Sequence, residues 1–189
     1  MRRLKWIGGA TGLVGIAGVA AGAVLGVVAG DPIDRYFSSN AFCAATCHAM
    51  TVTVAEELKA SAHWTTKTGV RPECRDCHVS EGLAAAYWDH FVGLRELYAA
   101  VIEGIDTVEE FEERRAALAD RVRLAMVATD SRNCRTCHLM EAIQPERPRG
   151  QKQHEEAREK GITCIVCHYN LVHKEAPLSA AFDEIVSSF

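Results

Sequence analysis

The sequence contains Cys74-Arg75-Asp76-Cys77-His78, in which two cysteines lie three positions apart and a histidine directly follows the second. The same C-x-x-C-H pattern returns at 134–138 and 164–168, and a version with one more residue between the cysteines stands at 43–48. C-x-x-C-H is the attachment signature of c-type haem, because two such thiols form thioethers to one porphyrin while the imidazole reaches the iron. The pattern predicts four covalently bound haem c groups. Their attachment residues are Cys43, Cys47, Cys74, Cys77, Cys134, Cys137, Cys164 and Cys167.

Three other uses of paired cysteines fit this sequence less well. Zinc ribbons also use C-x-x-C pairs, but they do not need a histidine after every second cysteine. A disulfide framework has no reason to repeat C-x-x-C-H. A thioredoxin-like redox motif requires one pair in a βαβ setting, and the sequence offers none.

The composition argues against a nucleic-acid-binding protein and predicts a small protein core. The chain has 189 residues, with 21 basic and 25 acidic side chains and a formal net charge of −4. It therefore has no basic field for nucleic acid, and we expect no DNA or RNA partner. Residues 7–30 supply a large share of the apolar side chains, so the remainder offers only a thin protein core. Haem groups are expected to fill much of the interior.

The N-terminus carries a long uncharged segment. No charge occurs from Ile7 to Gly30, and these residues would span about 36 Å as a helix, enough to cross a bilayer core of about 30 Å. Arg2, Arg3 and Lys5 precede the segment and Asp31 follows it, so the positive-inside rule places the N-terminus in the cytoplasm. We expect a retained single-pass anchor in the bacterial inner membrane, with the rest of the chain in the periplasm.

A cleaved signal peptide is the competing interpretation of this segment. Residues 21–23 offer an A-x-A-like cleavage site, but the apolar stretch is longer than a usual signal core. Both interpretations export the rest of the chain. Gly18, Gly22 and Gly26 form a small-xxx-small face on which a second helix can pack, and this suggests a homo-oligomer or a partner subunit.

The sequence predicts an all-α fold with two domains. Residues 1–30 form the cytoplasmic tip and transmembrane helix, and residues 31–189 form a helical, loop-rich tetrahaem cytochrome c domain. Helices are predicted over Leu83 to Glu103 and after a capping box in which Thr107 is the N-cap and Glu110 follows three residues later. No alternating run indicates a strand. Gln144 to Gly150, rich in proline and arginine, is predicted to be a surface loop.

Four haems offer eight axial positions, which the eight histidines of the chain would fill as four bis-histidine sites. Met50 complicates this count, because it lies two residues after His48 and thioether sulfur also binds haem iron; it can equally pack on the porphyrin. His90 suits proton exchange as well as ligation. The motif histidines are His48, His78, His138 and His168, and the others are His63, His90, His154 and His173.

The chain resembles the NapC/NirT family of membrane-anchored tetrahaem cytochromes, which includes NrfH-type subunits. The similarity covers nearly the whole sequence. Its most specific parts are Ser61-Ala-His63 ahead of Gly69-Val-Arg-Pro-Glu-Cys-Arg-Asp-Cys-His-Val79, Glu96-Leu-Tyr98, Gly104-Ile-Asp-Thr107 to Phe111, and Gly161-Ile-Thr-Cys-Ile-Val-Cys-His168 followed by His173-Lys174.

This resemblance implies a set of axial ligands. The first haem would be bound by Met50 rather than His48, with its other face open beside a quinol site. His63 would pair with His138 on the third haem. His173 would pair with His78 on the second, and His154 with His168 on the fourth. His90 is then outside the ligand set.

Two positions depart from the family pattern. The family's first motif is C-x-x-C-H, whereas this chain has one extra residue between Cys43 and Cys47. Relatives also tend to carry lysine at the position of His90, close to the quinol site together with a carboxylate that we place at Glu96. A histidine at this position can accept a quinol proton or ligate the first haem.

The resemblance implies a quinol dehydrogenase that takes electrons from menaquinol or ubiquinol and passes them to a periplasmic reductase, with His90 and Glu96 as the expected quinol-site residues. Two alternatives remain open. The same fold can reduce quinone with electrons from a periplasmic dehydrogenase, or it can serve as an anchored electron-transfer or assembly subunit without quinone chemistry. In each case the partner is expected to be multihaem or related to nitrogen oxides.

Overall fold

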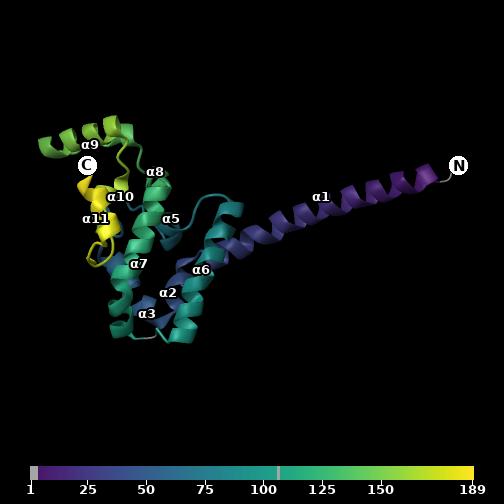
Figure 1. Cartoon of the computed structure of the whole chain (residues 1–189), viewed down its shortest axis with the longest axis horizontal. Helices are drawn as coiled ribbons and strands as arrows, with labels where there is room; N and C mark the ends of the chain where they lie inside the picture. The colour runs from purple at the N-terminus through teal and green to yellow at the C-terminus, as the bar shows by residue number, and fades with distance from the viewer. Residues whose placement is uncertain (1–3, 106) are drawn as a thin grey trace. The chain divides into compact units, whose positions relative to one another are not determined.

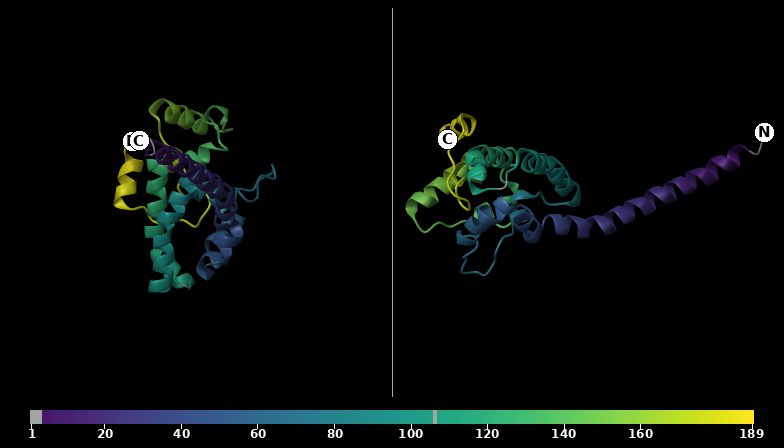
Figure 2. Two further views of the ribbon diagram at one scale, coloured as in Figure 1. Left: turned by 90° about the vertical axis from the view of Figure 1, so that its right-hand side faces the viewer. Right: turned by 90° about the horizontal axis from the view of Figure 1, so that it is seen from below.

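The structure is a computed structural model that describes residues 4–105 and 107–189, without the side chains of 4–13 and 27. The chain divides into two compact units, one ending at Phe37 and the other comprising Ser38–Phe189. Every regular element in the described residues is helical, and the three ribbon views contain no strand (Figures 1 and 2). The all-α prediction is confirmed.

The first unit is the single helix α1, Leu4–Phe37. Its stretch Val14–Phe37, 24 residues with a mean hydropathy of 1.8, is long and apolar enough to cross a membrane. The helix continues seven residues beyond Gly30, through Pro32, and Arg35 pairs with Asp31 at 2.8 Å. The basic residues Arg2 and Arg3, on which the orientation was predicted, lie outside the described residues.

The second unit consists of short helices around two long ones. The long helices are α6, Leu83–Glu103, and α7, Val108–Ala128, which follow each other across a short connection (Figure 1). The others are α2 (Asn40–Ala45), α3 (His48–Val52), α4 (Val54–Ala60), α5 (Cys74–His78), α8 (Arg132–Arg135), the 3-10 turn η1 (Met140–Ala142), α9 (Pro148–Lys160), α10 (Cys164–Cys167) and α11 (Ala180–Ser187).

The connection between α6 and α7 follows from local sequence. Gly104 ends α6 in the left-handed conformation, with φ at 71°, which glycine adopts without strain. Thr107 then caps α7: its hydroxyl accepts from the Glu110 amide at 3.2 Å, and the Glu110 carboxylate accepts from the Thr107 amide at 3.0 Å. The predicted capping box and the bounds of the first long helix are confirmed, while Asp106 lies outside the described residues.

The protein core of this unit is small and centres on Phe182, whose side chain is fully buried. Arg123 crosses from α7 toward the C-terminal segment and donates to the carbonyls of Ala176 and Pro177, each at 3.0 Å. Its guanidinium also lies 5.7 Å from the centre of the Phe182 ring. One polar cluster therefore joins α7 to the chain end, in keeping with the thin apolar core expected from composition.

The segment 144–150 is exposed, as predicted, but it is only partly a loop. Helix α9 begins at Pro148, because proline fixes φ at a helical value and the first turn does not need its missing N–H. The sequence prediction of a loop through Gly150 was therefore wrong for its last three residues.

Candidate haem-binding and redox site

Each C-x-x-C-H motif lies on or beside a short helix. The second motif forms α5 throughout, and the fourth forms α10 with His168 as its C-cap. Residues three apart on a helix share a face, so both thiols of each pair point to the same side. The extra residue of the first motif coincides with a break: α2 ends at Ala45 and α3 begins at His48.

The structure brings six histidines together as three pairs. The ring centroids of His63 and His138 lie 6.2 Å apart, those of His78 and His173 also 6.2 Å apart, and those of His154 and His168 6.0 Å apart. Each pair joins a motif histidine to a distal one. The partners are far apart in sequence in the first two pairs, so this arrangement is a product of the fold.

The separations fit an iron ion between the two rings of each pair. Metal–nitrogen bonds of about 2 Å on both sides, with the distance from each nitrogen to its ring centre added, place two centroids about 6 Å apart. Direct ring stacking would bring the centroids closer than this. Among the described residues, no three His, Cys, Asp or Glu side chains converge as a metal site.

The surroundings of the pairs favour neutral imidazoles, the form that binds iron. Burial lowers the pKa of His63, His168 and His173, and the neighbouring imidazole adds to this effect for the first two. Burial also lowers the pKa of His78 to about 4, with His173 as the second cause. Near neutral pH these rings therefore offer nitrogen lone pairs rather than positive charges.

The backbone fixes the tautomer of His154. Its Nδ1 lies 2.8 Å from the carbonyl oxygen of Gly150, one helical turn earlier. A carbonyl only accepts hydrogen bonds, so Nδ1 carries the hydrogen and Nε2 holds the lone pair. Metal-bound histidines are commonly held in this way.

At the first haem motif, His48 and Met50 both lie on α3 and are two positions apart. His48 is exposed and Met50 is half-buried. Side chains two apart on a helix do not face each other, so the two cannot both serve the same face of one haem. The other three motif histidines are exposed as well, so burial does not choose between His48 and Met50.

His90 lies apart from the three pairs, on α6. Its Nδ1 lies 2.7 Å from the carbonyl oxygen of Ala86, and its Nε2 lies 3.4 Å from the hydroxyl of Ser38, which is fully buried. Because the carbonyl only accepts, Nδ1 carries a hydrogen. His90 is therefore held with Nε2 facing a hydroxyl.

Glu96 lies six residues after His90, about 9 Å farther along the axis of α6. Its carboxylate pairs with Arg121 of α7 at 3.1 Å, and both side chains are substantially exposed. The described contacts do not bring Glu96 and His90 together.

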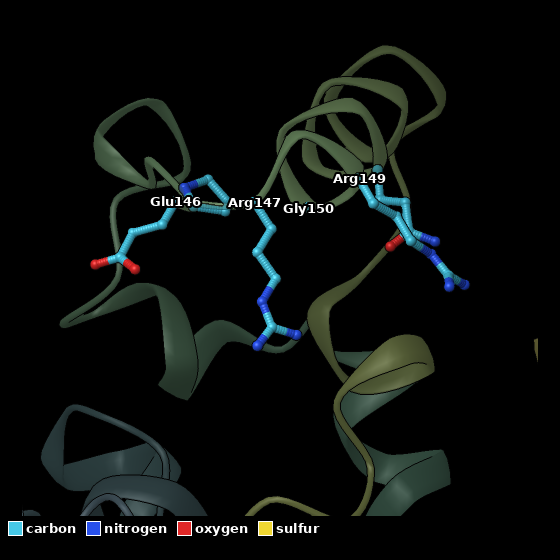
Figure 3. A pocket seen from close by; sticks show the side chains of 6 residues that line it. Glu146, Arg147, Arg149 and Gly150 are labelled. Atoms are coloured by element: carbon cyan, nitrogen blue, oxygen red, sulfur yellow. The ribbon is translucent and has the colours of Figure 1, made fainter.

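The surface hollows lie around the start of α9. One is open and is lined by Pro145, Glu146, Arg147, Arg149, Gly150 and Gln153, whose labelled side chains point in different directions (Figure 3). Another, of about 360 Å³, includes His154 in its lining. Neither contains a converging set of acid–base groups, so the histidine pairs are the stronger candidate for chemistry.

Sequence reasoning missed a charged cluster beside His173. Arg115 of α7 is 6% exposed and donates to Glu57 of α4 and to Glu112. A signal was present: Arg115 lies on the same face of α7 as Phe111 and Leu118, where an apolar residue is expected. Ser38, beside His90, had no comparable signal.

The comparison with protein families gives one match over most of the chain. The model described as NapC/NirT cytochrome c family, N-terminal region, matches residues 7–178. The comparison with solved structures gives no match.

Several curated proteins are similar in sequence. A probable tetraheme cytochrome c-type protein of Nitrosomonas europaea is 39% identical over 84% of this chain and 69% of its own length. The denitrification system component NirT of Stutzerimonas stutzeri is 37% identical over 79% of each chain. The cytochrome c-type protein NapC of Escherichia coli K12 is 33% identical over 72% of this chain and 69% of its own. With the four cysteine motifs and the three histidine pairs, these matches show that the chain belongs to the NapC/NirT cytochrome c family, whose members carry covalently bound haem c.

Proposed function

We propose that this protein is a membrane-anchored tetrahaem cytochrome c that oxidises membrane quinol and passes the electrons to a periplasmic redox partner. The observation that carries the proposal is the set of three histidine pairs with centroids 6.0–6.2 Å apart, each next to a cysteine motif. The bound haems would supply one-electron redox chemistry.

The eight motif cysteines would hold the porphyrins, and six histidines would bind iron as the pairs His78–His173, His63–His138 and His154–His168. Met50 would bind the first haem and leave its other face open. Helix α1 anchors the chain in the inner membrane with its N-terminus in the cytoplasm. The apolar stretch that begins at Val14 supports this anchoring.

The chain contributes acid–base chemistry through His90. Quinol oxidation releases two protons, and a base near the hydroxyl assists their departure. The Nε2 lone pair of His90, directed by the Ala86 carbonyl and facing a serine hydroxyl, suits this role. Trp88 and Phe91, both exposed and with ring centroids 5.7 Å apart, provide an apolar surface on the same helix for a quinone ring or lipid.

Glu96 is proposed as a second proton acceptor nearer the surface. It pairs with Arg121, and both side chains are exposed to solvent. A proton released at His90 can pass outward by way of water to this group.

Replacement of His90 tests the proposal. The full-length haem-loaded protein is mixed with a menaquinol or ubiquinol analogue in detergent, and haem reduction is followed by absorbance. His90→Ala is expected to slow reduction by about 100-fold, the usual contribution of a general base. Reduction by dithionite, which needs no proton acceptor, should match that of the unaltered protein.

Two results would contradict the assignment. Equal quinol rates for His90→Ala and the unaltered protein would remove His90 from the quinol site. Failure of the unaltered protein to accept electrons from any quinol analogue, with all four haems attached, would instead support an anchored electron-transfer subunit without quinone chemistry.

A further inference from the structure

The three distal histidines differ at Nδ1, the ring atom that faces away from a metal bound at Nε2. In His154 this atom donates to a backbone carbonyl. In His63 it is buried, with no hydrogen-bond partner among the described residues. In His173 it is buried and lies 3.4 Å from the carboxylate Oε2 of Glu57, as an electrostatic contact rather than an aligned hydrogen bond.

Three hydrogen bonds hold the Glu57 carboxylate in this place. Arg115 donates to both of its carboxylate oxygens, with Nη2 2.5 Å from Oε1 and Nη1 3.1 Å from Oε2. The backbone amide of Lys174 donates to Oε2 at 3.0 Å, directly after His173 in the chain. The carboxylate therefore has little freedom to leave the imidazole.

A second carboxylate completes the cluster. Glu112 accepts from Arg115 Nε at 2.8 Å and lies 3.2 Å from Lys174 Nζ. Two cations and two anions thus balance around His173. Arg115 also lies over the Phe111 ring, 5.1 Å from its centre, so the cluster is packed as well as paired.

Glu57 remains ionised in this cluster. Burial alone would raise the pKa of its carboxyl, but hydrogen bonds from Arg115 and the Lys174 amide outweigh burial and lower the pKa. The hydrogen bond from Arg115 is also the main reason that the pKa of Glu112 is lowered to about 2.

We propose that Glu57 is a positioning residue that orients His173 and lowers the reduction potential of the haem held by His78 and His173. A carboxylate at Nδ1 makes a bound imidazole more electron-donating and stabilises the oxidised metal, which carries the higher positive charge. This inference rests on the ligand pairing in the proposed function. It distinguishes this haem from those of His154 and His63, whose Nδ1 atoms lack a carboxylate contact in the described structure.

The test is a potentiometric titration of the full-length haem-loaded protein, with each haem followed by its electron paramagnetic resonance signal. Glu57→Gln is expected to move one of the four midpoint potentials to a more positive value and to change the g values of that signal. Glu56→Gln is the matched control, since it removes the same charge one position earlier from an exposed side chain that pairs with Lys59. It should move none.

A second variant distinguishes the effect of the Glu57–His173 contact from the effect of removing any nearby negative charge. Glu112→Gln removes a carboxylate from the same arginine but leaves Glu57 beside His173, so its shift should be clearly smaller. Equal shifts for Glu112→Gln and Glu57→Gln, or none for Glu57→Gln, would overturn the inference. If Glu57→Gln loses haem, Glu57→Asp is the substitute, because it keeps the negative charge but moves the carboxylate away from His173. An unchanged midpoint potential in Glu57→Asp would also overturn the inference.

His173→Ala distinguishes this failure from failure of the ligand pairing. It should convert one low-spin haem to high spin. If no haem changes spin state, the pairing itself is wrong. If one does and Glu57→Gln moves no potential, only the role of Glu57 is wrong.

Discussion

Two neighbouring side chains on helix α3 offer different ligands to the first haem. His48 follows the second cysteine as a motif histidine should and is exposed like the other three motif histidines, whereas Met50 is half-buried. This motif has one more residue between its cysteines than the three C-x-x-C sites, and a helix break falls inside it. We propose Met50 as the ligand of this haem because the family resemblance implies it.

Met50→Leu is expected to alter the spin state of one haem, because leucine fills the space without a donor atom. His48→Gln is the control and should leave all four haem spectra unchanged. Electron paramagnetic resonance of the two purified variants checks this. A change confined to His48→Gln would reverse the assignment.

His154 has the simplest surroundings of the three distal ligands. His154→Ala is expected to leave all four haems covalently attached, since the cysteines are untouched, but to produce one more high-spin haem than the unaltered protein has. Haem content by pyridine haemochromogen assay and the high-spin resonance signal measure the two effects. A high-spin signal equal to that of the unaltered protein would exclude His154 as a ligand.

For the helices, caps and hydrophobic periodicity in the sequence predicted the features that depend on neighbouring residues. The capping box at Thr107 and the limits of α6 were predictable because caps and periodicity act within a few residues. The end of α1 was not, since the charges after Gly30 mark a change in polarity rather than a break in the helix. The cluster of Glu57, Arg115 and Glu112 was missed because Glu57 and Arg115 are 58 residues apart in the chain.

Thr107→Ala tests the capping box directly. It removes the hydroxyl that accepts from the Glu110 amide, and loss of such a cap costs about 1 kcal/mol. The midpoint of thermal unfolding of the haem-loaded protein should fall by a few degrees. Thr68→Ala, in an exposed loop, is the control, and an equal fall in both variants would argue against a specific capping effect.

Across the whole molecule, bound haem groups would explain both the small protein core and the exposed apolar side chains of α6. Haem groups were expected to fill much of the interior, and in the protein alone Leu94, Leu97 and Val101 of α6 are exposed. The cysteine motifs predicted the number of haems, because attachment is a local chemical requirement. The histidine pairing could be anticipated only by resemblance to a family, since spacing along the chain does not determine which rings meet.

The proposed anchor makes a prediction for the mature chain. If α1 is retained, the intact mass of the purified protein equals that of the full chain plus four haems. Cleavage at the A-x-A-like site would remove Ala23 and everything before it. Mass spectrometry of the detergent-extracted protein separates these outcomes.

The direction of electron flow depends on potentials. Quinol oxidation is favourable when the haem that receives the electrons has a midpoint at or above that of the quinone pool. Titration of all four haems against the native quinone is expected to place at least the first haem there. Four midpoints well below the pool would favour quinone reduction by a periplasmic dehydrogenase.

Three haems are proposed to lie between histidine pairs, and the first haem is proposed to have a different ligand set. Near-infrared magnetic circular dichroism of the oxidised full-length protein identifies the axial ligands of low-spin haem. We predict low-spin bis-histidine signatures from three haems and none from the first haem, which would have Met50 on one side and an open face on the other. Four bis-histidine signatures would contradict this prediction and would make both His48 and His90 iron ligands.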